Sequence, residues 1–266
     1  MTSANDDDIG ERFAVTRDYI RLREAIPVEA HAHEFDTQMR RFAKLVPVGE
    51  QTRLFEIGPG SGWLLIHAAK LGLRCGGIEL NPELADFAGR RARESGVEIT
   101  IDVGDIQDRS LEPESCDIVV AHSVLEHVRD YRRMLENVYT ALRPGGLLYF
   151  NSTNKFALRS GEYPQIRLYG WLPYSVRERI RIARQGAGIV TSAGMDFHQF
   201  THPGLRRTLR DVGFRRLLDI YELLDVEDLN RPTRQRVLAM RAYKALPPLR
   251  HVIETFAPGT VFYCVK

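Results

Sequence analysis

The feature that most constrains the fold of this chain is an alternation of short apolar segments with amphipathic segments over residues 53–151. Short apolar runs between turn residues predict buried strands, and apolar side chains at helical spacing predict helices. Strands that alternate with helices in this way form a mostly parallel sheet with right-handed crossovers. We therefore expect an α/β, Rossmann-like fold with helices on both faces of the sheet, which binds its ligands at the carboxyl ends of the strands.

The pattern divides the chain into individual elements. Strands are expected over residues 53–57, 75–80, 98–102, 116–121 and 147–151. The helices between them are expected over residues 63–71, from Pro82 onward, and over residues 129–142, with Pro144-Gly145-Gly146 ending the last of these. Further along, we expect a helix over 203–212, a strand over 214–221, a helix over 231–246 and a last strand over 261–266.

Two segments lie outside this alternation. Residues 1–50 are expected to form a polar tail, frayed over 1–11, and a capping helix over 19–46, ahead of one domain over 51–266. Residues 155–191 are too many for a plain connection between elements, and they contain aromatic and basic side chains. An inserted helical lid is therefore expected at about residues 155–195.

A glycine-rich turn follows the first expected strand, with the sequence Glu56-Ile57-Gly58-Pro59-Gly60-Ser61-Gly62. Glycine lets the backbone bend sharply and lets a ligand approach where a Cβ atom would clash. The spacing is GxGxG, because Trp63 takes the place of the third glycine of a dinucleotide-binding GxGxxG loop. The Gly-Lys-Ser/Thr ending of a phosphate-binding loop is absent from this turn as well. By itself, the turn is also compatible with a bend that merely needs glycine.

Two acidic residues near the ends of the next strands indicate a nucleoside ligand. Glu79 lies 17 residues after Gly62, where its carboxylate can accept hydrogen bonds from both hydroxyl groups of a ribose while Leu80 packs against the base. Asp105 follows the third expected strand, where it can accept a hydrogen bond from an adenine amino group while Ile106 covers the ring. A solvated glutamate and an ordinary turn aspartate are the alternatives.

Together these segments resemble the class I S-adenosylmethionine-dependent methyltransferases, especially the small-molecule group that includes the ubiquinone-biosynthesis O-methyltransferases. The matching segments are LFEIGPGSG (54–62), IEL (78–80), GDI (104–106), CDIVVAHSVLEHV (116–128) and LRPGG (142–146). The resemblance is strong over residues 53–151, looser over 198–214, and says little about 155–191. It implies S-adenosyl-L-methionine as the cofactor, and a seven-stranded sheet whose antiparallel last strand is residues 261–266.

The resemblance also implies roles for matched positions. The cofactor-binding residues would be Glu56, Gly58, Pro59, Gly60 and Gly62 around the methionine part, Glu79 at the ribose, Asp105 and Ile106 at the adenine, and His122 and Ser123 at the methyl-transfer face. Some members bind a divalent metal through Glu-x-x-Glu-His after the fourth strand, but here Ser123 replaces the first glutamate. A hydroxyl in place of a carboxylate removes a hard oxygen ligand, so no metal is predicted.

Methyl transfer needs a nucleophile held in line, exclusion of water and a group that accepts one proton. The candidate catalytic bases are His198 and His202, which flank residues 199–201, and His122 after the fourth strand. Histidine titrates near neutrality, which suits proton acceptance, although a hydrogen-bonded structural histidine is the commoner role.

The distribution of charge bears on the acceptor. Residues 1–150 carry a net charge of −7 and residues 151–266 a net charge of +9. A basic half favours an anionic partner, although arginines that merely solvate helices give the same pattern. In the expected lid, Trp171, Tyr174 and the arginines at 177, 179, 181 and 184 suit a hydrophobic, anionic or membrane-associated acceptor. Nucleic acid is disfavoured, because aromatic side chains for base stacking are sparse.

The leading interpretation is an enzyme that transfers a methyl group to a small-molecule acceptor, with oxygen as the favoured nucleophile. The alternatives are a methyltransferase for a lipid-linked, glycan or other anionic acceptor, a non-catalytic cofactor-binding subunit, and an NAD-dependent or nucleotide-sugar oxidoreductase, which Trp63 disfavours. Three scattered cysteines without a CxxC pair argue against disulfides and a cysteine zinc site, so a reducing cytoplasm is expected. The acceptor, the methylated atom and the oligomeric state stay open.

Overall fold

The computed structural model describes residues 16–161, 163, 165–187, 194–226 and 233–266, so the expected frayed tail lies outside the described residues. A seven-stranded sheet with the order β3-β2-β1-β4-β5-β7-β6 forms its centre. The strands are β1 (Arg53–Ile57), β2 (Arg74–Glu79), β3 (Thr100–Val103), β4 (Cys116–His122), β5 (Leu142–Thr153), β6 (Arg216–Leu218) and β7 (Gly259–Val265). β1 to β5 pair in parallel, whereas β7 is antiparallel to both β5 and β6, which confirms the expected sheet.

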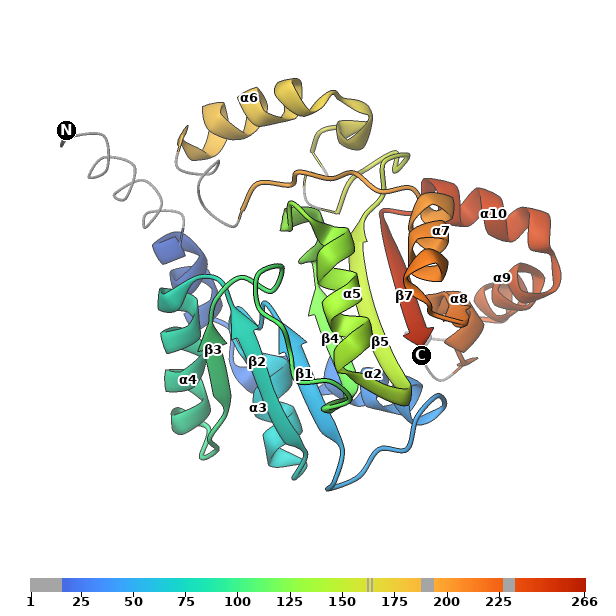
Figure 1. The fold of residues 1–266 in the computed structure, drawn as a ribbon. Helices are drawn as coiled ribbons and strands as arrows, with labels where there is room; N and C mark the ends of the chain where they lie inside the picture. The colour runs from blue at the N-terminus through green and yellow to red at the C-terminus, as the bar shows by residue number, and fades with distance from the viewer. Residues whose placement is uncertain (1–15, 162, 164, 188–193, 227–232) are drawn as a thin grey trace.

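Helices cover both faces of the sheet (Figure 1). The α-helices are α2 (Ala32–Ala43), α3 (Trp63–Lys70), α4 (Pro82–Glu94), α5 (Tyr131–Ala141), α6 (Tyr174–Gln185), α7 (His202–Val212), α8 (Ile220–Leu223), α9 (Arg234–Ala245) and α10 (Pro247–Phe256). Residues 16–24 are helical as well, and short 3-10 helices occur at η1 (Val28–His31), η2 (Leu125–His127) and η3 (Tyr169–Trp171). No helix in the described ranges is long and apolar enough to cross a bilayer.

Two expected elements differ from the structure. The strand expected over 214–221 is reduced to β6, because the Asp219 carboxylate accepts hydrogen bonds from the N–H groups of Tyr221 and Glu222 and so begins α8. The Glu222 side chain accepts in return from the Asp219 N–H, which completes a capping box. The helix expected over 19–46 is interrupted near Pro27, which has no N–H group to donate to a continuing helix.

The central strand β4 shows how the sheet is packed. Val119 and Ala121 belong to the core on the side of α5 and α7, whereas Ile118 and Val120 belong to the core on the side of α2 and α3. All four side chains are fully buried, as is typical of a parallel sheet that is covered on both faces. Phe42 of α2 is also fully buried in the core on the side of α2 and α3, so α2 and the sheet share that core.

The parallel register brings the functional segments to one edge of the sheet. Ile57 at the end of β1 lies opposite Ile78 of β2 and Ala121 of β4, so the loops that follow these strands emerge together. Asn81 caps α4 at this edge by accepting from the Glu83 N–H, which fixes the chain as it leaves β2. Figure 1 shows α6 above the same edge.

Candidate functional site

A cavity of about 680 Å³ lies at this edge, and we call it the glycine-loop cavity. Its walls come from the turn after β1, the ends of β2 and β4, the loop after β3, the N-terminal helix and the segment around α6. The sequence-predicted residues that line it are Glu56, Gly58, Pro59, Gly60, Glu79, Leu80, Asp105, Ile106, His122 and Ser123. Gly62, His198 and His202 are not among its lining residues.

The three glycines of the turn do different things. Gly58, Gly60 and Gly62 all adopt positive φ angles, of 66°, 53° and 72°, which glycine reaches without steric cost. Gly58 and Gly60 line the cavity, and a Cβ atom on Gly60 would lie 2.8 Å from the hydroxyl of Tyr19. Gly62 caps α3 instead, and a Cβ atom there would lie 2.8 Å from the Cβ of Ala88 in α4. Gly62 therefore permits close packing of two helices.

Glu79 presents a fixed carboxylate to the cavity. Its side chain is 5% exposed, Oε2 accepts a hydrogen bond from the Gly60 N–H, and Oε1 accepts one from the Asn81 N–H, each at 3.1 Å. Burial raises the pKa of Glu79, and these backbone hydrogen bonds act in the opposite direction. Because each carboxylate oxygen has a further lone pair, the group can still accept two hydroxyl hydrogens from a ligand. This arrangement fits the predicted ribose contact.

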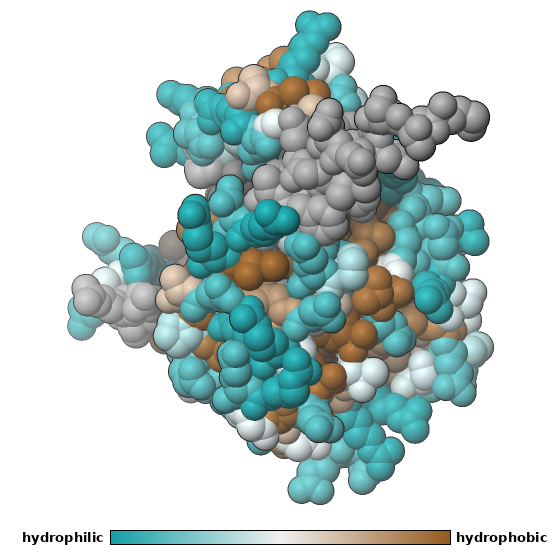
Figure 2. Space-filling view, turned by 90° about the vertical axis from the view of Figure 1, so that its left-hand side faces the viewer, coloured by the Kyte–Doolittle hydropathy of each residue, from teal (hydrophilic) through white to brown (hydrophobic). Residues whose placement is uncertain are grey.

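The loop after β3 forms the wall for a flat apolar group. Asp105 is held by Gln107, whose N–H donates to Oδ1 at 3.0 Å and whose amide donates to Oδ2 at 2.7 Å. Ile106 is buried beside it, while Leu80 is 41% exposed although it is apolar. Figure 2, which views the molecule from the side of α4, shows apolar surface in the middle of that face, below α6. A carboxylate between two apolar side chains suits a heteroaromatic ring with an amino group.

A buried pair connects the glycine turn with β4. Nε2 of His122 lies 2.8 Å from the side-chain amide nitrogen of Gln38 in α2, and Nδ1 lies 3.3 Å from Oε1 of Glu56, so both ring nitrogens are engaged. Burial raises the pKa of Glu56, and its Oε2 has no hydrogen-bond partner among the described residues. A buried acceptor without a partner in the wall of a cavity fits a ligand that brings a donor, such as an ammonium group.

The structure separates the three candidate histidines. His122 lies in the glycine-loop cavity, with both ring nitrogens hydrogen-bonded. His198 lies outside the lining of both cavities described here, and its Nε2 donates to the carbonyl oxygen of Arg129 at 3.0 Å. His202 is buried at the start of α7, where its ring stacks on Phe262 and its Nδ1 lies 3.2 Å from Oε2 of Glu254.

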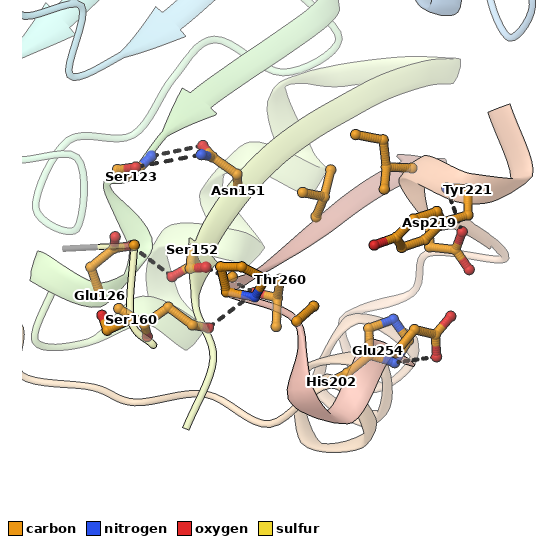
Figure 3. A pocket seen from close by; sticks show the side chains of 17 residues that line it. Ser123, Glu126, Asn151, Ser152, Ser160, His202, Asp219, Tyr221, Glu254 and Thr260 are labelled. Carbon is orange, nitrogen blue, oxygen red and sulfur yellow. Dashed lines mark hydrogen bonds and ion pairs between the residues drawn. The ribbon is translucent and has the colours of Figure 1, made fainter. Parts of the chain in front are cut away.

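His202 lines a second cavity, of about 370 Å³, between the ends of β5 and β7 and the helices α8 and α10. Figure 3 shows Ser123, Asn151 and Ser152 on one side of this second cavity and His202 and Glu254 on the other. Ser123 lines both cavities, so the two meet at the end of β4.

Two of the four arginines of α6 are buried and paired, whereas Arg179 and Arg184 are exposed. Arg177 and Arg181 are buried, and both pair with the fully buried carboxylate of Asp196, Arg181 at 3.2 Å. Tyr169 and Gln199 also donate to this carboxylate, at 3.1 and 2.6 Å. A buried charge needs such compensation, so these arginines hold α6 to the segment around Asp196.

Several cavity residues were missed by sequence reasoning. Thr16, Tyr19 and Arg23 line the glycine-loop cavity, and the Asn81 amide donates to Oγ1 of Thr16 at 2.8 Å. Their spacing places them on one face of a helix, which was the available signal. The sequence did not show that this helix face packs over the glycine turn, because a local pattern does not indicate which part of a sheet a helix covers.

Comparison with known proteins identifies the family that the chain is similar to. The family described as a methyltransferase domain matches residues 55–150. The chain is 31% identical over 186 residues to the ubiquinone biosynthesis O-methyltransferase of Paraburkholderia phymatum (strain DSM 17167 / CIP 108236 / LMG 21445 / STM815), which covers 65% of this chain and 76% of that protein. It is 26% identical over 197 residues to the protein of the same name from Coxiella burnetii (strain Dugway 5J108-111), which covers 70% and 75%.

The fold is similar to that of solved methyltransferases. The structure of an S-adenosylmethionine-dependent methyltransferase from Mesorhizobium loti superposes with a TM-score of 0.55 at 20% identity, over 85% of this chain and 96% of that one. Together with the sequence relatives, these findings establish that the cofactor is S-adenosylmethionine. The chain belongs to the class I S-adenosylmethionine-dependent methyltransferases.

Proposed function

We propose that this methyltransferase transfers the methyl group of S-adenosylmethionine to a hydroxyl oxygen of a small-molecule acceptor. The observation that carries the proposal is the fixed, buried carboxylate of Glu79 in a cavity that continues to Ser123, where a second cavity begins. An oxygen acceptor is supported by the relatives, which are named O-methyltransferases. When bound, the cofactor supplies a methyl group that is already activated by the positive charge on its sulfur.

We assign the cofactor contacts from the chemistry of the walls. Glu79 accepts the ribose hydroxyl groups, and Asp105 accepts the adenine amino group beside Ile106. The unpartnered Oε2 of Glu56 accepts from the ammonium group of the methionine part. Gly58 lines this part of the cavity, and a Cβ atom there would lie 2.7 Å from Cγ2 of Val124, so glycine permits the close approach of Val124.

The segment around α6 is proposed as the lid over this cavity, and the N-terminal helix as its cap. Tyr163 and Arg181 of the lid and Tyr19 and Arg23 of the cap all line the glycine-loop cavity. A lid and a cap of this kind exclude water and hold the reactants in line, and orientation alone can contribute roughly 7–11 kcal/mol to such a step.

The engaged histidine bears on the acceptor. Both ring nitrogens of His122 are engaged, one with Gln38 and the other with Glu56, so we assign His122 to holding Glu56 in place and not to proton transfer. A site without a free base at this point favours an acceptor whose hydroxyl group is itself acidic, such as a phenol, because it ionises with little assistance.

The experiment that tests the proposal is isothermal titration with S-adenosylmethionine and S-adenosylhomocysteine. Glu79→Gln removes the charge from a group that accepts two ligand hydrogen bonds, so we expect both ligands to bind about 10- to 100-fold more weakly. Glu98→Gln is the matched control, because Glu98 is exposed and lies outside both cavities. Wild-type protein that binds neither ligand would overturn the proposal, and formation of S-adenosylhomocysteine with a panel of phenols and alcohols would identify the acceptor class.

A further inference from the structure

We propose that the second cavity holds the acceptor, that it selects an uncharged one, and that the Nε2–H group of His202 binds the end of the acceptor remote from the methyl group. This inference rests on the proposed function and specifies its substrate class. It is carried by three independent features: where the second cavity begins, which charges line it, and a buried donor without a partner.

The second cavity begins at a strained residue that also lines the glycine-loop cavity. Ser123 has a φ angle of 50°, which is unfavourable for a residue with a side chain. Its N–H donates to Oδ1 of Asn151 at 2.9 Å, and the Asn151 amide donates back to Oγ of Ser123 at 3.4 Å. Strain of this kind persists at functional sites where the surroundings hold it in place. Asn151 thus fixes the residue at which the two cavities meet.

The walls of the second cavity provide no positive partner for an anion. Among the described residues that line it there is no lysine or arginine, and its ionisable groups are Glu126, His202, Asp219, Tyr221 and Glu254. Burial raises the pKa of Glu126, whose Oε2 accepts a hydrogen bond from Ser152 at 2.6 Å. An anionic acceptor would lose its hydration here without gaining a counter-charge, which is costly.

The acidic groups at the far end of the second cavity are compensated, because Arg250 lies 3.2 Å from Asp219 and 3.7 Å from Oε1 of Glu254. Burial, together with the nearby carboxylate of Asp219, raises the pKa of Glu254 to about 8. Burial lowers the pKa of His202 to about 4. A cationic acceptor therefore meets no free negative charge at this end. Because neither an anionic nor a cationic acceptor finds a partner, an uncharged acceptor fits the second cavity best.

His202 supplies a specific donor at this end. Nδ1 of His202 and Oε2 of Glu254 lie 3.2 Å apart, and burial lowers the pKa of His202 while it raises that of Glu254. We therefore assign the shared proton to Glu254 and the ring proton to Nε2. Nε2 is buried and has no hydrogen-bond partner among the described residues. Figure 3 shows His202 paired with Glu254 through one nitrogen only, with the other on the opposite side of the ring. A buried donor without a partner is unfavourable unless a ligand oxygen accepts from it.

The test compares two probes that differ in charge at one end only, 3,4-dihydroxybenzoate and its methyl ester. We expect the ester to be methylated at least about 10-fold more efficiently, in kcat/KM at pH 7, because only the acid brings a buried charge without a partner. His202→Phe keeps the ring that stacks on Phe262 and should raise the KM for the ester about 3- to 10-fold, the worth of one hydrogen bond. The Kd of S-adenosylmethionine should stay unchanged.

Two further variants make the result decisive. His202→Gln restores an N–H donor and should bring the KM part of the way back, whereas His33→Phe, at an exposed histidine of α2 that lines neither cavity, should have no effect. The inference is overturned if the acid and the ester are methylated with equal kcat/KM, or if His202→Gln behaves like His202→Phe. It is also overturned if the cofactor binds while neither probe is methylated. Failure of wild-type protein to bind the cofactor would instead overturn the proposed function.

Discussion

Gly62→Ala should destabilise the protein and leave cofactor binding intact, although Gly62 belongs to the glycine turn. The new residue would adopt a φ angle of 72°, which costs a non-glycine residue about 1–2 kcal/mol. Its Cβ atom would lie 2.8 Å from the Cβ of Ala88 and 3.3 Å from its Cα, and overpacking of this kind costs about 1–3 kcal/mol. Reduced entropy of the unfolded chain offsets less than about 1 kcal/mol. A net loss of about 3 kcal/mol corresponds to roughly 6–12 °C in Tm.

The assay is thermal and denaturant unfolding together with titration of S-adenosylmethionine. Ala88→Gly removes the Cβ atom that meets the new side chain, at a cost of its own of about 1 kcal/mol within α4. In that background Gly62→Ala should cost only the backbone penalty, so the double-mutant cycle should show a coupling of about 1–3 kcal/mol. Unchanged stability with a large loss of cofactor affinity would refute this reasoning and place Gly62 in the binding site.

Two more perturbations follow from buried charges. Asp196→Ala leaves Arg177 and Arg181 buried without their carboxylate, so we expect a loss of about 3–5 kcal/mol in the free energy of unfolding, and a loss below about 1 kcal/mol would contradict the pairing. The pKa of His202 falls from 6.5 to about 4 on folding, so at this group the folded state binds fewer protons, and the contribution of His202 to stability is lost as the pH drops through this range. The free energy of unfolding should be measured at pH 7 and at pH 4.5. Its decrease between the two pH values should be about 1–3 kcal/mol smaller in His202→Phe than in wild-type protein.

The central part of the fold could be predicted because its signals are local. The strand over 53–57 was predicted with the bounds of β1, and the other strands of the parallel region to within a few residues, because buried strands and amphipathic helices differ in their periodicity. Cavity positions such as Glu79 and Asp105 followed from the rule that ligands bind at the carboxyl ends of parallel strands. The strand over 214–221 was wrong in its second half, since the apolar pattern did not reveal the capping box at Asp219.

The roles of individual side chains in the site required the tertiary structure. Gln38 and His122 are 84 residues apart in the chain, and only the fold brings them within hydrogen-bond distance. Arg177 and Arg181 had the pattern of a solvated basic helix until the fold placed Asp196 between them. A titratable group takes its charge from its burial and its partners, and neither is visible in the residue type alone.

The sequence was therefore sufficient for the fold class and the methyltransferase family, because each depends on short-range periodicity and on spacing within single loops. Only the tertiary structure separated the roles of Gly58, Gly60 and Gly62, and only it placed His122 and His202 in different cavities that meet at Ser123. The physical reason is that these roles depend on packing and burial between segments distant in the chain, such as α3 against α4 and α7 against α10, for which a local pattern contains no signal.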